Sequence, residues 1–289
     1  MKFLIYLPSH NRPDKLTRQI LAIDEFAKDI GYEIHVIVNL NGDAIGSIDC
    51  SNVSLLQNSH PSNIGANINI GLGFLTFKKY SDFDFFWLLS DDDQVVGLPS
   101  LAFFERCNAD SIEIIHLASQ DKELSLLDKD NFLTFGGFPG LGLISLGIYS
   151  KKFIQKMELS SSLEDGIRFS FPHLVIIYRN LHGGLKVRSL MYKKVIKDLE
   201  FSESLTGYLP SLRHFPYFFN ELPYWIAIVE ASKWALTCTN FFWRSERNKR
   251  SFIFSLGGLV LTYPPTLIFA LVGILLHPRI KQLLKKIVK

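Results

Sequence analysis

Three consecutive carboxylates, Asp91 to Asp93, follow the apolar run "FFWLL" at 85–89 after a single residue, Ser90. The apolar side chains favour burial, whereas adjacent carboxylates repel one another and favour water or a cation. Carboxylate oxygens are the ligands that Mg²⁺ and Mn²⁺ prefer, and these ions usually bridge to a substrate diphosphate. The spacing therefore predicts a rigid strand whose end holds a metal ion and a diphosphate. A solvated acidic turn, or a cap on a helix that starts near 97–98, is the alternative interpretation.

The segments around these carboxylates predict an α/β domain, because apolar or alternating runs are separated by helical periodicities. The predicted strands are 3–7, ended by Pro8, then 32–43, 53–58, 82–89 and 111–119, and the predicted helices are 12–31 and 63–80. This alternation favours a mostly parallel sheet with helices on both faces. Ligands of such sheets bind outside the carboxyl ends of the strands, where the three carboxylates are expected to lie.

Four motifs occur in a characteristic order over about 95 residues. They are "LPSHNRPDKL" (7–16), "VNLNGD" (38–43), "NIGANINIG" (63–71) and the carboxylates 91–93. In this order they resemble the family 2 glycosyltransferases, which have the Rossmann-like GT-A fold. Within that family, "FFWLLSDDD" is most similar to the sugar transferases of bacterial O-antigen and capsule synthesis, including the abequosyltransferase-like group. The segments 138–154 and 183–187 resemble the acceptor-side strand and helix and the strand that follows the catalytic helix.

The resemblance implies a metal-dependent transfer of a sugar from a nucleotide-diphosphate sugar to a lipid-linked glycan in surface polysaccharide synthesis. It places the Mg²⁺ or Mn²⁺ ion on Asp91 and Asp93. The implied nucleotide-sugar-binding residues are Pro8, His10, Asn11, Arg12, Asn39, Asn63, Gly65, Asn69, Asp91 and Asp92.

Two positions depart from the pattern of the family. Asn39 stands where an Asp often accepts the uracil N3–H, and Ile68 stands where an Arg often contacts the diphosphate. Because an amide both donates and accepts, Asn39 is compatible with cytosine as well as uracil. The donor is therefore expected to be CDP-, UDP- or dTDP-linked.

The catalytic base has two candidates. The family usually supplies an Asp from an acidic pair, and the pair in this region is Glu164-Asp165. His173 lies where counting back from Gly183 would place the base, and a neutral imidazole is also competent. We favour Asp165 as the base, with Glu164 beside it and His173 in the acceptor site. The alternatives are a solvated loop for the acidic pair and a ring packed on the core for His173.

The C-terminal part differs in composition, which predicts a glycosyltransferase domain over 1–215 and an aromatic, basic helical region over 216–289. Residues 244–289 carry nine Lys or Arg and one acid, whereas the remainder carries 22 bases and 27 acids. This asymmetry favours attachment to an anionic membrane surface and disfavours a nucleic-acid partner. The run 251–276 has no charge but is interrupted by Pro264-Pro265, which predicts a re-entrant or interfacial hairpin with both ends in the cytoplasm. A single kinked span and a buried helix pair are the alternatives.

These features predict a peripheral or monotopic protein at the cytoplasmic face of the inner membrane, with a polyprenyl-diphosphate-linked glycan as acceptor. Two other functions are weighed against this one. A nucleotidyltransferase would need a Gly-rich basic loop after the first strand, and "PSHNRP" contains no glycine. A catalytically degenerate membrane-bound scaffold is favoured by Asn39 and Ile68 and disfavoured by the intact carboxylates.

Overall fold

The computed structural model describes residues 1–42, 45–118, 123–127, 144–159, 163, 172–193 and 195–198. The chain divides into two units, Met1–Leu199 and Glu200–Lys289, and all described residues belong to the first. The predicted boundary at 215/216, the aromatic region and the membrane hairpin at 251–276 lie outside the described residues. Among the helices that the structure describes, none combines the length and the apolar character needed to cross a bilayer.

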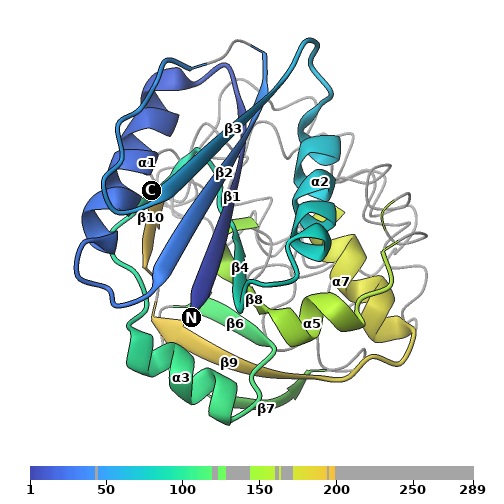
Figure 1. The fold of residues 1–289 in the computed structure, drawn as a ribbon. Helices are drawn as coiled ribbons and strands as arrows, with labels where there is room; N and C mark the ends of the chain where they lie inside the picture. The colour runs from blue at the N-terminus through green and yellow to red at the C-terminus, as the bar shows by residue number, and fades with distance from the viewer. Residues whose placement is uncertain are drawn as a thin grey trace, which may run out of the picture. The chain divides into compact units, whose positions relative to one another are not determined.

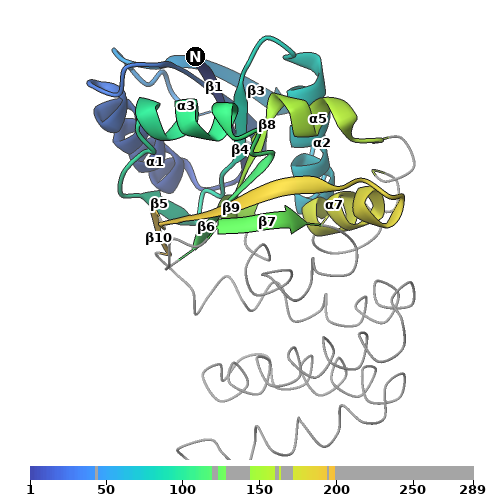
Figure 2. The ribbon, with the colours of Figure 1, turned by 90° about the horizontal axis from the view of Figure 1, so that it is seen from below.

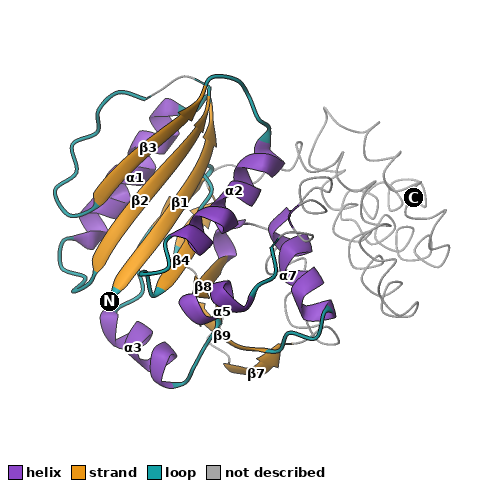
Figure 3. Ribbon diagram, turned by 45° about the vertical axis from the view of Figure 1, so that its right-hand side comes forward, coloured by secondary structure: helices purple, strands orange, loops and turns teal. Residues whose placement is uncertain are grey.

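The first half of the sheet consists of four neighbouring parallel strands. These are β1 (Lys2–His10), β2 (Glu33–Asn41), β3 (Ser54–His60) and β4 (Phe85–Leu88). β1 pairs with β2 on one side and with β4 on the other, and β3 pairs with β2. Figure 3 shows the arrowheads of β1, β2 and β3 at one edge of the sheet. All four strands were predicted from the sequence, and their existence is confirmed.

The second half of the sheet mixes strand directions. β8 (Gly147–Ser150) is antiparallel to both β4 and β6 (Ile114–Ala118), β9 (Val187–Lys193) is parallel to β6, and β7 (Glu123–Leu127) is antiparallel to β9. The full order is β3-β2-β1-β4-β8-β6-β9-β7. The sheet is thus mixed but mostly parallel. A separate two-stranded ribbon pairs β5 (Asp93–Val95) with β10 (Ile196–Asp198).

Helices cover both faces of the sheet, as predicted for an α/β protein. Their bounds are α1 (Pro13–Ala27), α2 (Ala66–Lys79), α3 (Leu101–Ala109), η1 (Ile144–Leu146), α5 (Lys151–Lys156) and α7 (Pro172–His182). Figures 1 and 2 show α1 and α3 on one face, and α2, α5 and α7 on the other. α1 begins with a proline at its first position, where the missing N–H breaks no helical hydrogen bond.

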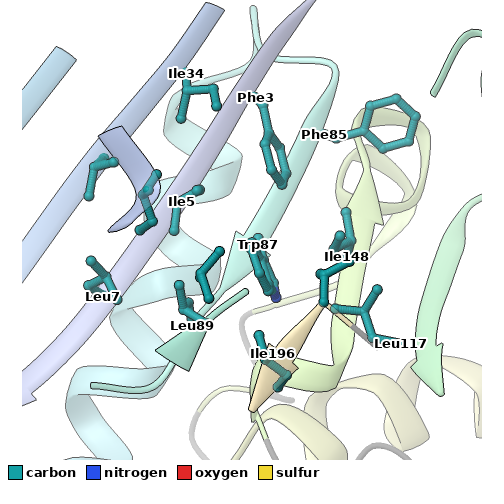
Figure 4. Close-up of a cluster of buried hydrophobic side chains, with 14 of the residues drawn as sticks. Phe3, Ile5, Leu7, Ile34, Phe85, Trp87, Leu89, Leu117, Ile148 and Ile196 are labelled. Carbon is teal, nitrogen blue, oxygen red and sulfur yellow. The ribbon is translucent and has the colours of Figure 1, made fainter. Parts of the chain in front are cut away.

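The main core lies between the sheet and the helices α1 and α3. Alternate residues of β1 point into it, namely Phe3, Ile5 and Leu7, all fully buried (Figure 4). Phe3 stacks on Trp87 of β4 with the ring centroids 6.1 Å apart. Because successive strand side chains point to opposite faces, the even-numbered side chains of β1 lie on the α2 face, where Tyr6 contacts Asn69.

The predicted end of the first strand at Pro8 is wrong, because β1 continues to His10. The carbonyls of Lys2 and Tyr6 accept hydrogen bonds from the Asp84 and Leu89 amides. The backbone N–H and C=O groups of even-numbered residues of β1 therefore point toward β4. The ladder between β1 and β4 ends at the pair Tyr6 and Leu88. The missing N–H of Pro8 therefore falls on a side where no strand partner follows, and the strand tolerates it.

Candidate functional site at the carboxyl edge of the sheet

The strand order creates a switch point between β1 and β4. From β1 the chain moves outward through β2 to β3, and then returns to the other side of β1 as β4. Ligands of open α/β sheets bind at such a point, outside the carboxyl ends of the strands. His10 ends β1, and the three carboxylates follow β4. The tertiary structure therefore brings the predicted motifs to one edge.

Asp91 is bonded through both of its carboxylate oxygens. Its exposed fraction is 6%. Oδ2 accepts a hydrogen bond of 2.5 Å from the Ser9 hydroxyl, and Oδ1 lies 3.2 Å from the Arg12 guanidinium. Arg12 also pairs with Asp92, and Lys15 Nζ lies 3.7 Å from the same carboxylate. Two cations of the chain thus offset part of the negative charge of the motif.

The charges of this cluster influence one another. Burial raises the pKa of Asp91, while the Ser9 hydrogen bond and the Arg12 charge act in the opposite direction. The hydrogen bond to Asp92 is the main cause that raises the pKa of Arg12, which therefore stays a cation. Sequence reasoning missed Ser9 and Lys15 as partners of the carboxylates. The sequence feature that could have indicated them is their position three residues before and three residues after Arg12.

The turn that carries the carboxylates is held from three sides. The Ser145 hydroxyl accepts a hydrogen bond of 2.8 Å from the Ser90 amide, and the Ser145 carbonyl accepts one of 2.8 Å from the Trp87 indole. Asp93 then begins β5, where the Gln19 side chain of α1 accepts from the Val95 amide at 3.1 Å. These contacts come from η1, β4 and α1, and they fix the position of the motif.

The backbone at Asp93 is paired in a strand register that the sequence did not predict. In the antiparallel ribbon of β5 and β10, Asp198 stands directly opposite Asp93. Asp93 itself is buried. Because Asp198 follows Asp93 by about a hundred residues, only the tertiary structure could reveal this pairing.

A buried amide network connects β1, β2 and α2. Asn39 donates from Nδ2 to Asn69 Oδ1 at 2.7 Å, and Asn69 donates from Nδ2 to the Asn39 carbonyl at 2.9 Å. The Tyr6 hydroxyl donates to the Asn69 carbonyl at 3.1 Å, and burial raises the pKa of that hydroxyl. His60 Nε2 lies 3.0 Å from Asn39 Nδ2 and 3.2 Å from Asn39 Oδ1. Both Asn39 and Asn69 are thus engaged within the protein.

The loop before α2 folds back on the ends of β1 and β2. The Asn41 side chain accepts a hydrogen bond of 3.1 Å from the Ile64 amide, and the Asn63 side chain accepts one of 2.8 Å from the Gly65 amide. Gly65 has a positive φ of 82°, which favours glycine at this position. A Cβ there would meet nothing within 4 Å, so the requirement is conformational and not one of close packing. Ile68, at the departure from the family pattern, is exposed.

Two backbone turns shape the rim beside His10. Asn11 has a positive φ of 51° and Gly42 one of 113°. A Cβ at Gly42 would lie 2.4 Å from Asn11 Oδ1, so a side chain there would clash. The turns after β1 and β2 therefore fit together only with glycine at this position.

The candidates for the catalytic base are not brought to this edge by any described contact. Glu164 and Asp165 lie outside the described residues. His173 lies in the first turn of α7 with an exposed fraction of 1%, which fits a ring packed in the core. Its role in acceptor binding stays a prediction.

The donor set of the site suits a hard cation, because both candidate ligands, Asp91 and Asp93, are carboxylates. Among the residues that the structure describes, no group of three or more His, Cys, Asp or Glu side chains is arranged to hold a metal ion. Both oxygens of Asp91 have protein partners. The residues therefore fit Mg²⁺ or Mn²⁺ by type, provided that the Arg12 guanidinium gives way.

The fold and the site define an α/β protein with a polar, charged ligand site at the switch point of a mixed sheet. No family model and no curated protein matches the chain. Among solved structures, S. aureus TarS is 11% identical over 91% of this chain and 54% of its own, with a TM-score of 0.45. The complex of S. aureus TarS 1-349 with UDP-GlcNAc is 11% identical over 95% of this chain and 89% of its own, with a TM-score of 0.41.

A197 from STIV is 12% identical over 68% of this chain and 84% of its own, with a TM-score of 0.38. The chain spans about half the length of the first of these proteins. TM-scores this low do not establish a common fold. The function proposed below therefore rests on the site and on the order of its motifs.

Proposed function

We propose that this chain is a metal-dependent glycosyltransferase of the GT-A type that uses a nucleotide-diphosphate sugar as donor. The observation that carries the proposal is the placement of the three carboxylates beside Ser9 and Arg12 at the switch point of the sheet. A diphosphate needs cations, and a metal ion on carboxylates together with an arginine can supply them. The four motifs that resemble the family converge on the same edge.

Asp93 and Asp91 would hold the Mg²⁺ or Mn²⁺ ion, which when bound offsets the charge that builds on the leaving nucleoside diphosphate. Arg12 and Asp92 lie beside these two residues. In this proposal Arg12 exchanges its carboxylate partners for the donor phosphates. The rim on the β1 and β2 side, where the nucleoside would lie, consists of His10, Asn11, Asn63 and Gly65. Pro8 lies two residues before His10 on β1.

We propose a role for Asn39 and Asn69 that differs from the one predicted from the sequence. Their side chains bond each other, and Asn39 has an exposed fraction of 4%. We propose that they support the floor of the nucleoside site, and that direct base recognition by Asn39 would require it to leave His60.

For the acceptor reaction we keep Asp165 as the proposed base, with Glu164 beside it and His173 on the acceptor side. Asp165→Asn is expected to abolish turnover while donor and metal binding stay normal, since a base acts only on the acceptor hydroxyl. His173→Ala should weaken acceptor use instead. Retained turnover in both variants would show that neither residue is the base.

We also propose that the acceptor is a polyprenyl-diphosphate-linked glycan of O-antigen or capsule synthesis. The proposal rests on the uncharged run 251–276 with basic flanks, which suits a peripheral or monotopic protein at the cytoplasmic face of the inner membrane. In a topology assay, a label at Lys289 should be accessible only from the cytoplasm. A periplasmic label would contradict the hairpin.

The decisive experiment is a screen of nucleotide-sugar hydrolysis with the wild type and Asp93→Ala, each with and without EDTA. Loss of the charge-stabilising carboxylate should lower turnover at least about a hundredfold. Asp82→Ala is the matched control, because Asp82 is exposed and pairs with Lys2 instead. Full activity of Asp93→Ala, or activity that EDTA leaves unchanged, would refute the metal assignment.

A further inference from the structure

His10, Asn41 and His60 form a row across three neighbouring strands. His10 pairs in register with Asn41, and Asn41 pairs in register with His60. Because paired residues of parallel strands point to the same face, these three side chains lie on the α2 side of the sheet. The row ends the strands at the same edge that carries the carboxylates, and Asn41 is buried in its middle.

The hydrogen bond of His10 determines which ring nitrogen can accept. Its Nδ1 lies 2.7 Å from the Asn41 carbonyl oxygen. A carbonyl can only accept, so Nδ1 carries the proton and Nε2 of the neutral ring presents a lone pair. The Asn63 amide nitrogen lies 3.4 Å from Nε2, as expected for a donor that faces an acceptor. His10 is exposed, so a ligand can reach this nitrogen.

Asn39, the residue first expected to recognise the base, is already engaged. Its Nδ2 donates to Asn69 at 2.7 Å, and both of its amide atoms lie within hydrogen-bond distance of His60. It is also buried below the edge. His10 Nε2, in contrast, is an acceptor at the exposed edge, and the Asn63 side chain that faces it at 3.4 Å is itself exposed and would turn aside for a ligand.

The charges of the site decide on which side a nucleobase would lie. Arg12, Lys15 and the carboxylates gather at the ends of β1 and β4, where the phosphates belong. Next to β4 stands β8, which runs antiparallel and so brings its amino end to this edge. A nucleoside that extends away from the phosphates along the parallel strands passes over His10 toward β2 and β3.

From this geometry we propose that His10 selects the donor base, by accepting the ring N3–H of uracil or thymine through Nε2. The inference rests on the proposed function of the site. Cytosine has no N3–H and would set its own lone pair against that of His10, so CDP-linked sugars are the disfavoured donors among the pyrimidines. This assigns to His10 the recognition that sequence reasoning had given to Asn39.

The test is calorimetric titration of the full-length protein with UDP, dTDP, CDP and N3-methyl-UDP, each in the presence of Mn²⁺. UDP and dTDP should bind at least about tenfold more tightly than CDP and N3-methyl-UDP, because the latter two leave the acceptor unpaired. The methylated ligand probes the hydrogen bond without any change to the protein.

The matched variants are His10→Phe and His35→Phe. His10→Phe keeps a ring but removes the acceptor, so it should reduce the preference for UDP over CDP to about twofold or less. His35→Phe changes an imidazole near the amino end of β2, next to Phe83 and Glu33, and should leave the preference intact.

CDP binding as tight as UDP binding in the wild type, or an unchanged preference in a folded His10→Phe variant, would overturn the assignment of His10 while the proposed function stands. Failure of every nucleoside diphosphate to bind would overturn the proposed function itself, and this inference with it.

Discussion

The two faces of β1 are held in different ways. On the α1 face, Phe3, Ile5 and Leu7 pack among other apolar side chains, and the contacts are non-directional (Figure 4). On the α2 face, the Tyr6 hydroxyl and the Asn39–Asn69 pair depend on specific donors and acceptors. Apolar packing tolerates exchange of similar volumes, whereas a buried polar group must keep its partner. One face of the strand is thus held by apolar packing, and the other depends on specific hydrogen bonds.

The comparison predicts the largest effect on stability at the apolar face. Phe85 is fully buried, with its ring centroid 4.5 Å from that of Phe104. Phe85→Ala should lower the free energy of unfolding by about 3–5 kcal/mol through lost burial and a cavity. Because Phe85 begins β4, far along the strand from the carboxylates, the folded variant should bind UDP with unchanged affinity.

Urea denaturation and calorimetry of the same samples test this separation. Phe85→Leu is the control and should lose much less stability, since it retains most of the volume. Weaker UDP binding by a fully folded Phe85→Ala protein would show that the two faces are coupled.

The polar face should respond with a smaller loss of stability but a direct loss of binding. Asn69→Ala removes the acceptor of Asn39 Nδ2, the donor to the Asn39 carbonyl and one of the two acceptors of the Tyr6 hydroxyl. The loss of these buried hydrogen bonds should lower the free energy of unfolding by about 1–3 kcal/mol. The affinity for UDP should fall in parallel, because Asn39 supports the edge through His60.

Asn108→Ala is the matched control for this change. Asn108 is an exposed helical asparagine of α3, and its replacement should alter stability by less than about 0.5 kcal/mol. If Asn69→Ala were as mild as this control, the amide network would be dispensable.

The smallest effect is a change in metal affinity, and it is expected at Arg12, beside the carboxylates. Arg12, with 41% of its side chain exposed, competes with any cation for Asp91 and Asp92. An ion pair of this exposure contributes roughly 1 kcal/mol, so Arg12→Gln should strengthen Mn²⁺ binding in the absence of nucleotide by about fivefold. The affinity for UDP should decrease, because the arginine is no longer there to pair with the phosphates.

Calorimetric titration with Mn²⁺ alone, and then with UDP, measures both changes. Arg18→Gln in the same helix is the control, since the Arg18 side chain donates a hydrogen bond to the Asp14 carbonyl of its own helix. Metal binding that weakens in Arg12→Gln would mean that Arg12 supports the cation site instead of competing for it.

Local patterns of the sequence determined the elements and the order of the motifs. The apolar run 3–7, the alternation in 32–43, and the apolar spacing of Leu16, Ile20 and Ile23 predicted two strands and a helix whose existence the structure confirms. The apolar run before Asp91 likewise indicated a buried strand with carboxylates at its end. Periodicity and turn chemistry are properties of neighbouring residues, so they can be read without knowing the fold.

Only the tertiary structure decided which side chains meet. Ser9 and Asp91 are 82 positions apart in the chain, and Asn39 and Asn69 are 30 apart. The reversed strand β8 between β4 and β6, and the passage of β1 through Pro8, also depend on which strands become neighbours. Hydrogen-bond partners follow from register and packing between distant segments, and no local pattern encodes them. For that reason the sequence could assign base recognition to Asn39 but could not predict that its amide bonds Asn69, or that His10 Nδ1 faces the Asn41 carbonyl.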